Sequence, residues 1–229
     1  MLEVSINTLR RWDESGKLKS VRKGERGHRF YKRDDLTLFK TDLFDLAKKW
    51  ASNSEGREPE ERFYCQNSSI FQVRLGRLLA ELKEMPGMAS LYSLIVAITG
   101  EIGNNSFDHN LGNWPDVPGI FFGYNLNKRE MVLADRGQGI FYTLKRVKPN
   151  LKNHKEALRV AFTEIISGRA PESRGNGLKF VRQVVEQNPI NLIFQSGDAL
   201  LKIKQDGGGK LDLKEKQDYI RGCIALIKF

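Results

Sequence analysis

The pattern of apolar and polar positions reverses within residues 91–110. The first half, LYSLIVAITG, contains no charge, whereas the second half, EIGNNSFDHN, is mostly polar. In that half Glu101, Asn105, Asp108 and His109 fall at offsets of 0, 4, 7 and 8. At about 100° per residue these offsets form a single stripe on a helix. We therefore predict one helix that is buried where it begins and carries a polar face toward its end.

Helical and strand patterns are intermixed in the chain after residue 61. Apolar residues at helical spacing cover three further segments, 69–84, 154–166 and 177–187. Apolar runs bounded by turn residues predict strands at 119–126, 130–135, 190–196, 199–204 and 222–229. The short connections between several of these strands favour hairpins. We predict an α+β fold in which helices pack on one face of a mixed, mostly antiparallel sheet.

The same pattern divides the chain into three regions. Residues 1–50 begin with VSINTLRRWDESGKL, a helix that Ser5 caps and Gly16 ends, and close with DDLTLFKTDLFDLAKKW, which has helical spacing. Residues 51–61, ASNSEGREPEE, are polar and contain helix breakers, so we predict a linker there. Residues 62–229 are expected to form the α+β domain.

Composition predicts a folded protein with an anionic partner. The 229 residues are 40% hydrophobic, which is sufficient for a buried core. The net charge is +10, and residues 1–33 hold ten Lys or Arg against four acids, more than half of the excess. Charge concentrated in one small unit indicates nucleic acid more specifically than a basic surface spread over the whole protein does.

The cysteines and the hydropathy disfavour other classes. Cys65 and Cys223 are far apart and form no CxxC pair, so neither a disulfide framework nor a zinc cluster is predicted. No apolar stretch approaches the ~20 residues of a membrane span, and the N-terminus lacks the apolar core of a signal peptide. We expect a cytoplasmic protein without a membrane partner.

The N-terminal pattern of a helix followed by a basic hairpin is that of a winged helix-turn-helix. Its motif VSINTLRRW…SGKL…GHRFY resembles the MerR-type and excisionase-like DNA-binding families, in which a further helix precedes the Val-Ser pair. The resemblance implies a DNA-binding unit whose first helix is absent or lies upstream of Met1. The residues expected to meet the groove or the phosphates are Arg10, Arg11, Arg22, Lys23, Arg26, His28 and Arg29. Alternatively these charges are the solvated face of an interaction domain; Leu9, Trp12 and Phe30 are expected in its core.

The polar stripe suits nucleotide chemistry. The amide oxygen of Asn105 can be a neutral ligand for Mg²⁺, which prefers oxygen and keeps waters and phosphate oxygens around it. Glu101, one turn earlier on the same side, can hold or deprotonate a water aimed at a terminal phosphate. The alternative is an ordinary solvated face of an amphipathic helix, which this spacing alone does not exclude.

Two glycine-rich turns favour the nucleotide interpretation. The segment MVLADRGQGI predicts a strand that ends at Asp135, whose carboxylate can accept a hydrogen bond from an exocyclic amine. Gly137 and Gly139 allow the backbone to pass close to a flat ring. In SRGNGLKFV, Gly175 and Gly177 open a helix whose N–H groups and positive end can meet phosphates. The three motifs in this order predict a single nucleotide site.

Together the three motifs resemble those of the GHKL ATPases, the group of gyrase-type topoisomerases, the ninety-kilodalton heat-shock chaperone, histidine kinases and MutL proteins. EIGNNSFDH corresponds to the N box, DRGQG to the first glycine box and RGNGL to the second. The resemblance covers residues 62–229 and implies a Bergerat-type α/β sandwich that binds ATP and Mg²⁺. It implies that Asn105 ligates Mg²⁺, that Glu101 positions or activates water, and that Asp135 binds the adenine amino group.

The same resemblance extends to further residues around the nucleotide. Those expected to line the pocket are Asp108, Gly137, Gly139, Gly175, Gly177, Leu178 and Lys179; Arg174 is a further candidate for a phosphate contact that the resemblance does not itself imply. Residues 140–174 are expected to be a lid that closes over phosphate, with Arg169 as a second candidate for a phosphate contact, although a solvated loop charge is the alternative for either arginine. Two positions depart from the family: Gly222-Cys223 stands where Gly-Thr is usual, and Lys179 stands where small or apolar residues are usual.

Three functions remain open at this point. The first is a Mg²⁺-dependent, slowly hydrolysing ATP-binding protein that regulates transcription by binding DNA, with the nucleotide changing the lid or a homodimer. The second is a protein serine kinase of the anti-sigma-factor type acting on a partner protein, because His28, His109 and His154 lack the context of a phosphoacceptor histidine. The third is a nucleotide-binding interaction module without turnover.

Overall fold

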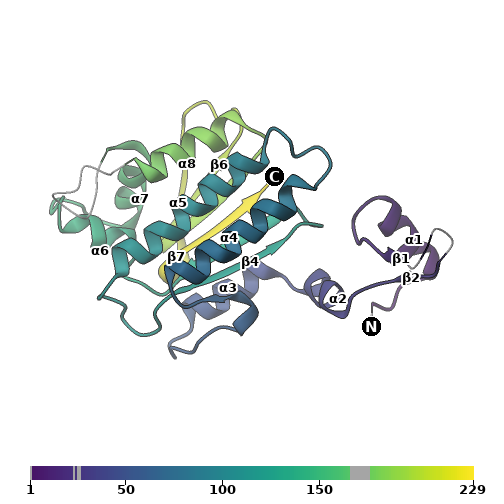
Figure 1. Ribbon diagram of the computed structural model, residues 1–229. Helices are drawn as coiled ribbons and strands as arrows, with labels where there is room; N and C mark the ends of the chain where they lie inside the picture. The colour runs from purple at the N-terminus through teal and green to yellow at the C-terminus, as the bar shows by residue number, and fades with distance from the viewer. Residues whose placement is uncertain (1, 23, 25–26, 166–175) are drawn as a thin grey trace.

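The computed structural model describes most of the chain (Figure 1); the described residues are 2–22, 24, 27–165 and 176–229. The N-terminal unit lies to one side of the main body and consists of α1 (Ile6–Glu14), β1 (Val21–Arg22), β2 (Arg29–Phe30) and α2 (Arg33–Lys40). The predicted cap of α1 is present, because Ser5 Oγ accepts a hydrogen bond from the Thr8 N–H at 3.1 Å. Gly16 follows the helix with φ +72°, a conformation that favours glycine. The predicted helix and basic hairpin are therefore confirmed.

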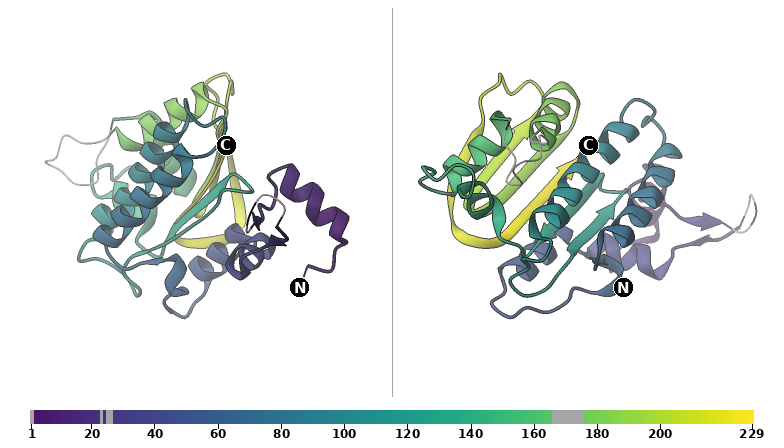
Figure 2. Two further views of the ribbon diagram at one scale, coloured as in Figure 1. Left: turned by 45° about the vertical axis from the view of Figure 1, so that its right-hand side comes forward. Right: turned by 60° about the vertical axis from the view of Figure 1, so that its left-hand side comes forward.

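The main body is built on a five-stranded sheet of order β3-β4-β5-β7-β6 in which neighbouring strands run antiparallel. Its strands are β3 (Tyr64–Cys65), β4 (Ile120–Asn125), β5 (Glu130–Asp135), β6 (Asn191–Lys204) and β7 (Asp212–Lys228). The last two form a long ribbon that curls beside the helical layer (Figure 2). The strands predicted at 190–196 and 199–204 are one strand, because the register shift at Gly197 bends the ribbon without ending it.

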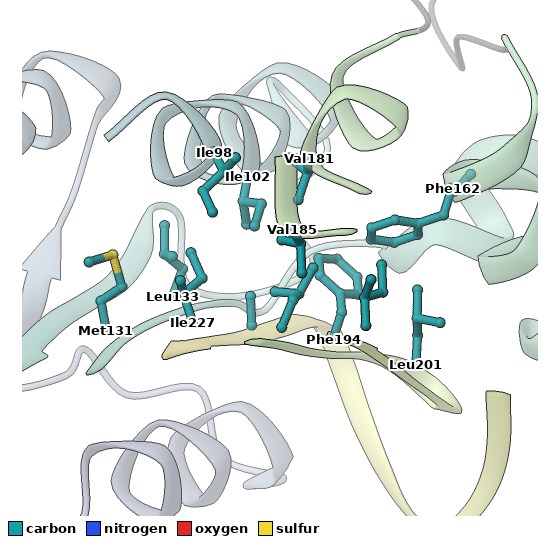
Figure 3. Close-up of a cluster of buried hydrophobic side chains, with 14 of the residues drawn as sticks. Ile98, Ile102, Met131, Leu133, Phe162, Val181, Val185, Phe194, Leu201 and Ile227 are labelled. Atoms are coloured by element: carbon teal, nitrogen blue, oxygen red, sulfur yellow. The ribbon is translucent and has the colours of Figure 1, made fainter. Parts of the chain in front are cut away.

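Most helices cover one face of this sheet. They are α4 (Ser68–Lys83), α5 (Tyr92–Asn110), α6 (Gly139–Lys145), α7 (His154–Thr163) and α8 (Gly177–Gln187), and a short 3₁₀ turn, η1 (Glu61–Phe63), precedes β3. Ile102 of α5, Val185 of α8 and Phe162 of α7 point toward the sheet, where Leu133 and Phe194 meet them (Figure 3). Burial of these side chains fixes which side of α5 is left for polar groups.

The opposite face of the sheet is covered by α3 (Leu43–Ser52). Along β5, Met131 and Leu133 belong to the main core, whereas Val132 and Ala134 pack in a second cluster with α3. Successive side chains of a strand point to opposite faces, so both faces of β5 are buried. The sequence analysis predicted helices on one face of the sheet only. That part of the prediction is wrong, because α3 covers the other face.

The assignment of residues 1–50 to the N-terminal unit also changes. The segment that the pattern predicted as one helix is two, α2 and α3, and Asp42 caps the second by accepting a hydrogen bond from the Asp45 N–H at 3.0 Å. Because α3 packs on the sheet, it is part of the main body. The α+β class itself, with antiparallel pairing and helices packed on the sheet, is confirmed.

Candidate functional site

Helix α5 presents its polar side to the start of α8. A methyl group added at Gly177 would lie 2.5 Å from Glu101 Oε2 and 3.3 Å from Asn105 Nδ2. Both polar side chains are half-buried. The predicted acid and amide therefore lie side by side, directly against the second glycine motif, although 72 residues separate Asn105 from Gly177 in the sequence.

The first turn of α8 has no side-chain cap from its own N-cap residue. The N-cap residue Asn176 makes no side-chain cap hydrogen bond, and Gly177 has no side chain to cover the backbone. Val181 and Val185 bury the opposite face of the helix and hold it in place. The first N–H groups of a helix have no intrahelical partner, so this end offers donors and the positive end of the helix dipole next to Glu101 and Asn105.

Asp135 ends β5 inside the protein, with 1% of its surface exposed. Its Oδ2 accepts a hydrogen bond from Ser106 Oγ at 2.8 Å, and its Oδ1 accepts one from the Gly137 N–H at 2.8 Å. Burial raises the pKa of Asp135 to about 6, while the hydrogen bonds from Ser106 and from the Gly137 and Cys223 N–H groups limit the rise. This carboxyl is held in one orientation and titrates near neutrality.

Glycine is required where β7 passes Asp135. Gly222 has φ +76°, and a Cβ there would lie 2.3 Å from Asp135 Oδ1. Gly139 has φ +73°, and its Cβ would lie 2.9 Å from Ser196 Oγ, which donates to the Gly222 carbonyl at 3.0 Å. Cys223, which directly follows Gly222, donates its backbone N–H to the Asp135 carboxylate. The position where the family usually has threonine is therefore adjacent to the predicted adenine ligand.

Two buried polar residues of α5 belong to this arrangement and were missed in the sequence. Ser106 donates to Asp135, and Asn110 Oδ1 accepts from the Gln138 N–H at 2.8 Å. A Cβ at Gly137 would overlap the Asn110 amide, which explains the glycine there. Each of the two residues directly follows a member of the polar stripe, Asn105 or His109, and the two are four positions apart, so they share the neighbouring side of the helix. That i, i+4 pair of polar residues was the signal in the sequence.

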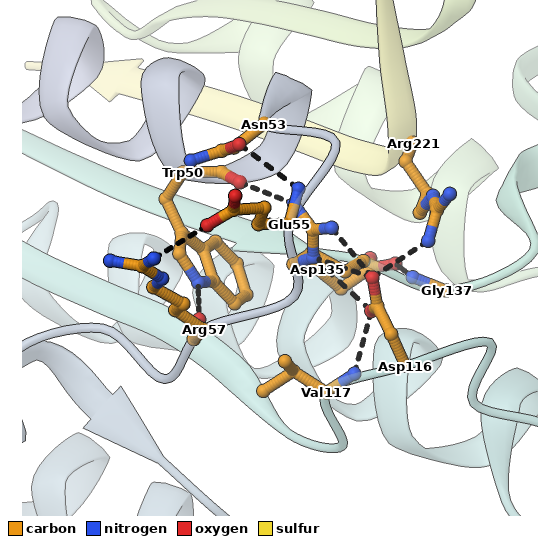
Figure 4. Close-up of polar contacts among 10 residues, drawn as sticks. Trp50, Asn53, Glu55, Arg57, Asp116, Val117, Asp135, Gly137 and Arg221 are labelled. Atoms are coloured by element: carbon orange, nitrogen blue, oxygen red, sulfur yellow. Dashed lines mark hydrogen bonds and ion pairs between the residues drawn. The ribbon is translucent and has the colours of Figure 1, made fainter.

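A cluster of charged side chains lies behind the first glycine motif (Figure 4). Arg136 is fully buried and donates to Asp116 through Nη2 at 2.6 Å and to the Trp50 carbonyl through Nη1 at 2.5 Å. Arg221 Nη1 donates to the same carboxylate at 2.7 Å. Burial opposes the charge of Asp116, but the bonds from Arg136 and the Val117 N–H hold its pKa below the ordinary value. No sequence motif indicated this group, which we call the Asp116 junction: Asp116, Arg136, Arg221 and the carbonyl of Trp50.

The other predicted pocket residues are placed as follows. Asp108 is exposed on α5, and Leu178 and Lys179 are half-buried on α8. Arg169, Arg174 and Gly175 lie outside the described residues. Helix α7 buries Leu158 and Phe162 in the main core, so the part of the predicted lid that α7 forms is a fixed part of the fold. Residues 166–174 of the predicted lid lie outside the described residues.

A metal ion would need ligands from outside the protein. Among the described residues, no group of three or more His, Cys, Asp or Glu could hold one. An ion at Asn105 would therefore take most of its ligands from phosphate oxygens and water, which suits Mg²⁺. The residues around Asn105 therefore suit a cation that arrives bound to a nucleotide better than a cation that the protein holds by itself.

The basic side chains of the N-terminal unit fall into two groups. Arg10 and Arg11 are exposed on α1 and have no ion pair among the described residues. Arg22 and Arg29 instead pair with Asp13, at 3.4 and 2.7 Å. Both arginines were predicted as DNA contacts, and their bonds to Asp13 also join the hairpin to α1.

The remaining predictions for this unit have mixed outcomes. His28 is exposed, and Lys23 and Arg26 lie outside the described residues. Trp12 is partly buried against Phe39 at 5.0 Å between ring centroids. The prediction that Phe30 lies in the core is wrong, since 53% of it is exposed on the short hairpin.

Comparison with known proteins supports the DNA-binding part of the interpretation. The family described as MerR family regulatory protein matches residues 1–31. The chain is also 42% identical over 55 residues to the type II methyltransferase M.Eco47II of Escherichia coli, a match that covers 24% of this chain and 13% of that protein. The GHKL resemblance of the main body rests on its sequence motifs. In the part of the chain that the structure describes, no helix is long and apolar enough to cross a membrane.

Proposed function

We propose that residues 62–229 bind ATP with Mg²⁺ and hydrolyse it slowly, and that the protein is a DNA-binding regulator whose state depends on the nucleotide. The observation that carries the proposal is the meeting of Glu101 and Asn105 with Gly177 at the N-terminal end of α8. The first N–H groups of the helix lie at this end, beside the carboxylate and the amide. An anion between them would satisfy both the N–H groups and the helix dipole.

Each residue has a distinct role in this proposal. Asp135 accepts a hydrogen bond from the adenine amine, and the Ser106 hydroxyl holds the carboxylate in place. Asn105 offers its amide oxygen to the cation that accompanies the phosphates, and that cation neutralises phosphate charge when bound. Glu101 orients a water toward the terminal phosphate and takes its proton. The first N–H groups of α8, beginning at Gly177, donate to phosphate oxygens.

The ATP part is tested by calorimetric titration with a non-hydrolysable ATP analogue and Mg²⁺. We expect saturable, Mg²⁺-dependent binding by the wild-type protein that Asn105→Ala abolishes. Asn104→Ala is the matched control, because the neighbouring Asn104 turns away and accepts a hydrogen bond from Gln72 Nε2 at 2.8 Å. Absence of binding by the folded wild-type protein, or equal loss in both variants, would overturn the proposal.

The DNA part is tested by measuring affinity for duplex DNA at several salt concentrations. Arg11 is exposed and unpaired among described residues, so Arg11→Ala should lower the salt dependence by about one released counterion. Arg57→Ala is the control, because Arg57 is an exposed cation of the linker that pairs with Glu55. An unchanged salt slope in Arg11→Ala would mean that this face of α1 does not meet the phosphates.

The kinase alternative predicts a different product. In an ATPase, Glu101→Ala should retain nucleotide binding and lose phosphate release. A protein serine kinase would instead move the terminal phosphate to a serine of a partner, and labelled phosphate would appear on protein. No described contact favours that outcome over hydrolysis, so the regulator remains the conclusion.

A further inference from the structure

Asp116 lies in the connection between α5 and β4, on the side of the first glycine motif away from Asp135. Its carboxylate accepts from Arg136 Nε at 3.2 Å, from Arg136 Nη2 at 2.6 Å and from Arg221 Nη1 at 2.7 Å. Its own loop adds the Val117 N–H at 2.6 Å. One side chain therefore holds two guanidinium groups, in a geometry that bidentate charge-assisted bonds define narrowly.

Both guanidinium groups are attached to the backbone of the candidate pocket. Arg136 stands between Asp135 and Gly137, the two residues whose hydrogen bond shapes the first glycine motif. Arg221 directly precedes Gly222, whose close passage past Asp135 leaves no room for a side chain. If ligand binding shifts either backbone segment, the guanidinium group attached to that segment moves relative to the Asp116 carboxylate.

The same junction holds the C-terminal end of α3. The Trp50 carbonyl is among the last four of that helix, which have no intrahelical partner, and Arg136 Nη1 satisfies it. The guanidinium also lies 5.9 Å from the Trp50 ring centroid. Figure 4 shows Trp50, Asp116 and Arg221 converging from three separate elements.

The segment that leaves α3 is fixed at the same place. Trp50 Nε1 donates to the Arg57 carbonyl at 2.6 Å, so the chain folds back over the indole. A Cβ at Gly56 would lie 2.9 Å from Asp116 Oδ2, which puts the linker backbone in contact with the junction. At its other end, α3 continues directly from the N-terminal unit through residues 41–42.

We propose that the Asp116 junction couples the nucleotide pocket to α3 and, through α3, to the N-terminal DNA-binding unit, with Arg136 as the positioning residue. The proposal rests on the proposed function, because the signal is the presence of nucleotide next to Asp135. Nucleotide binding restrains the 135–137 and 221–222 segments and thereby stabilises the bonds that both arginines make to Asp116 and the bond that Arg136 makes to the end of α3. The coupling is reciprocal. If nucleotide changes the affinity for DNA by some factor, DNA changes the affinity for nucleotide by the same factor.

The closing experiment compares amide hydrogen exchange in residues 47–57 with and without the ATP analogue and Mg²⁺. In the wild-type protein we expect nucleotide to slow exchange at least fivefold, the lower end of ordinary allosteric coupling. Arg136→Lys should retain nucleotide binding and lose this protection, because one ammonium cannot reproduce the fork that meets Asp116 through Nε and Nη2 and the Trp50 carbonyl through Nη1. Arg221→Lys is the matched control and should keep the protection, since Arg221 pairs with the same carboxylate but makes no hydrogen bond to α3 among the described residues.

The outcomes separate this proposal from the proposed function. Nucleotide binding without protection in the wild-type protein, or with equal protection in Arg136→Lys, would overturn the coupling and leave the ATP site intact. Absence of nucleotide binding by the folded wild-type protein would overturn both. If Arg136→Lys does not fold, as judged by near-ultraviolet circular dichroism, Asp116→Asn replaces it, and retained protection there would equally refute the coupling.

Discussion

Gly177 and Glu101 are in direct contact although 76 positions separate them: a Cβ at Gly177 would lie 2.5 Å from Glu101 Oε2. The contact lies between α5 and α8 at the N-terminal end of α8, where the first backbone N–H groups of a helix have no intrahelical partner. A side chain of any size at this glycine must displace the carboxylate. The pair therefore offers a way to move the candidate catalytic group without removing it.

Gly177→Ala should lower ATP hydrolysis by about 10- to 100-fold, because a displacement of about 1 Å in a catalytic group has effects of that size. Folding should be unaffected, since Glu101 is flexible and alanine favours a helix. The matched control is Gly76→Ala in α4, where nothing lies within 4 Å of the added methyl group, and which should gain up to ~1 kcal/mol of stability with normal turnover. Steady-state phosphate release measures both, and full turnover in Gly177→Ala would argue against a catalytic Glu101.

Asp135 should give nucleotide affinity and folding stability opposite pH dependences. Its pKa is raised to about 6 by burial, so the folded protein favours the protonated form. Its contribution to stability is therefore complete below the unfolded pKa near 4 and is lost as pH rises through about 6. Nucleotide binding needs the ionised acceptor, so affinity should rise over the same interval.

Asp135→Asn should remove both pH dependences between pH 4.5 and 7. Denaturant unfolding and calorimetric titration at several pH values, each compared with the wild-type protein, measure them. Asn keeps the acceptor for the Gly137 N–H and a donor toward Ser106, so the variant should fold. A wild-type affinity that is flat across this range would show that Asp135 does not bind the base.

Asp13 should hold the basic hairpin on α1. It accepts from the Ser20 N–H at 2.8 Å and from Arg29 Nε at 2.7 Å, and these bonds keep the pKa of Asp13 well below its usual range. Asp13→Ala should make amide exchange in residues 18–31 about tenfold faster, the change expected for the loss of one charge-assisted hydrogen bond. Glu14→Ala is the control.

Glu14 is the control because it faces the same arginine without holding it closely. Glu14 also faces Arg29, but its side chain is 69% exposed and 3.6 Å away, so its loss should change exchange little. The stabilisation by Asp13 should be present above about pH 4, the pKa of Asp13 in the unfolded chain, and should be lost progressively as pH falls from there toward the much lower pKa of Asp13 in the folded protein. Equal exchange in the two variants would mean that the hairpin is held by other contacts.

The apolar run of β5 shows what the pattern contained and what was overlooked. Four consecutive residues, MVLA, are apolar, which is typical of a strand buried on both faces. Helix α3 covers the second face, yet its amphipathic pattern was assigned to the N-terminal unit. Periodicity identifies a buried side of a helix, but it does not say which surface buries it.

The sequence by itself determined the elements and the local motifs: the capped helix at Ser5, the α+β alternation, and the polar stripe from Glu101 to Asn105. These follow from contacts between residues close in the chain, which spacing and residue type record. Only the tertiary structure decided that Gly177 meets Glu101, that Ser106 braces Asp135, and that Asp116 gathers Arg136, Arg221 and the end of α3. Those partners come from packing between distant segments, and a buried arginine next to a glycine motif has the same sequence signature as a solvated one.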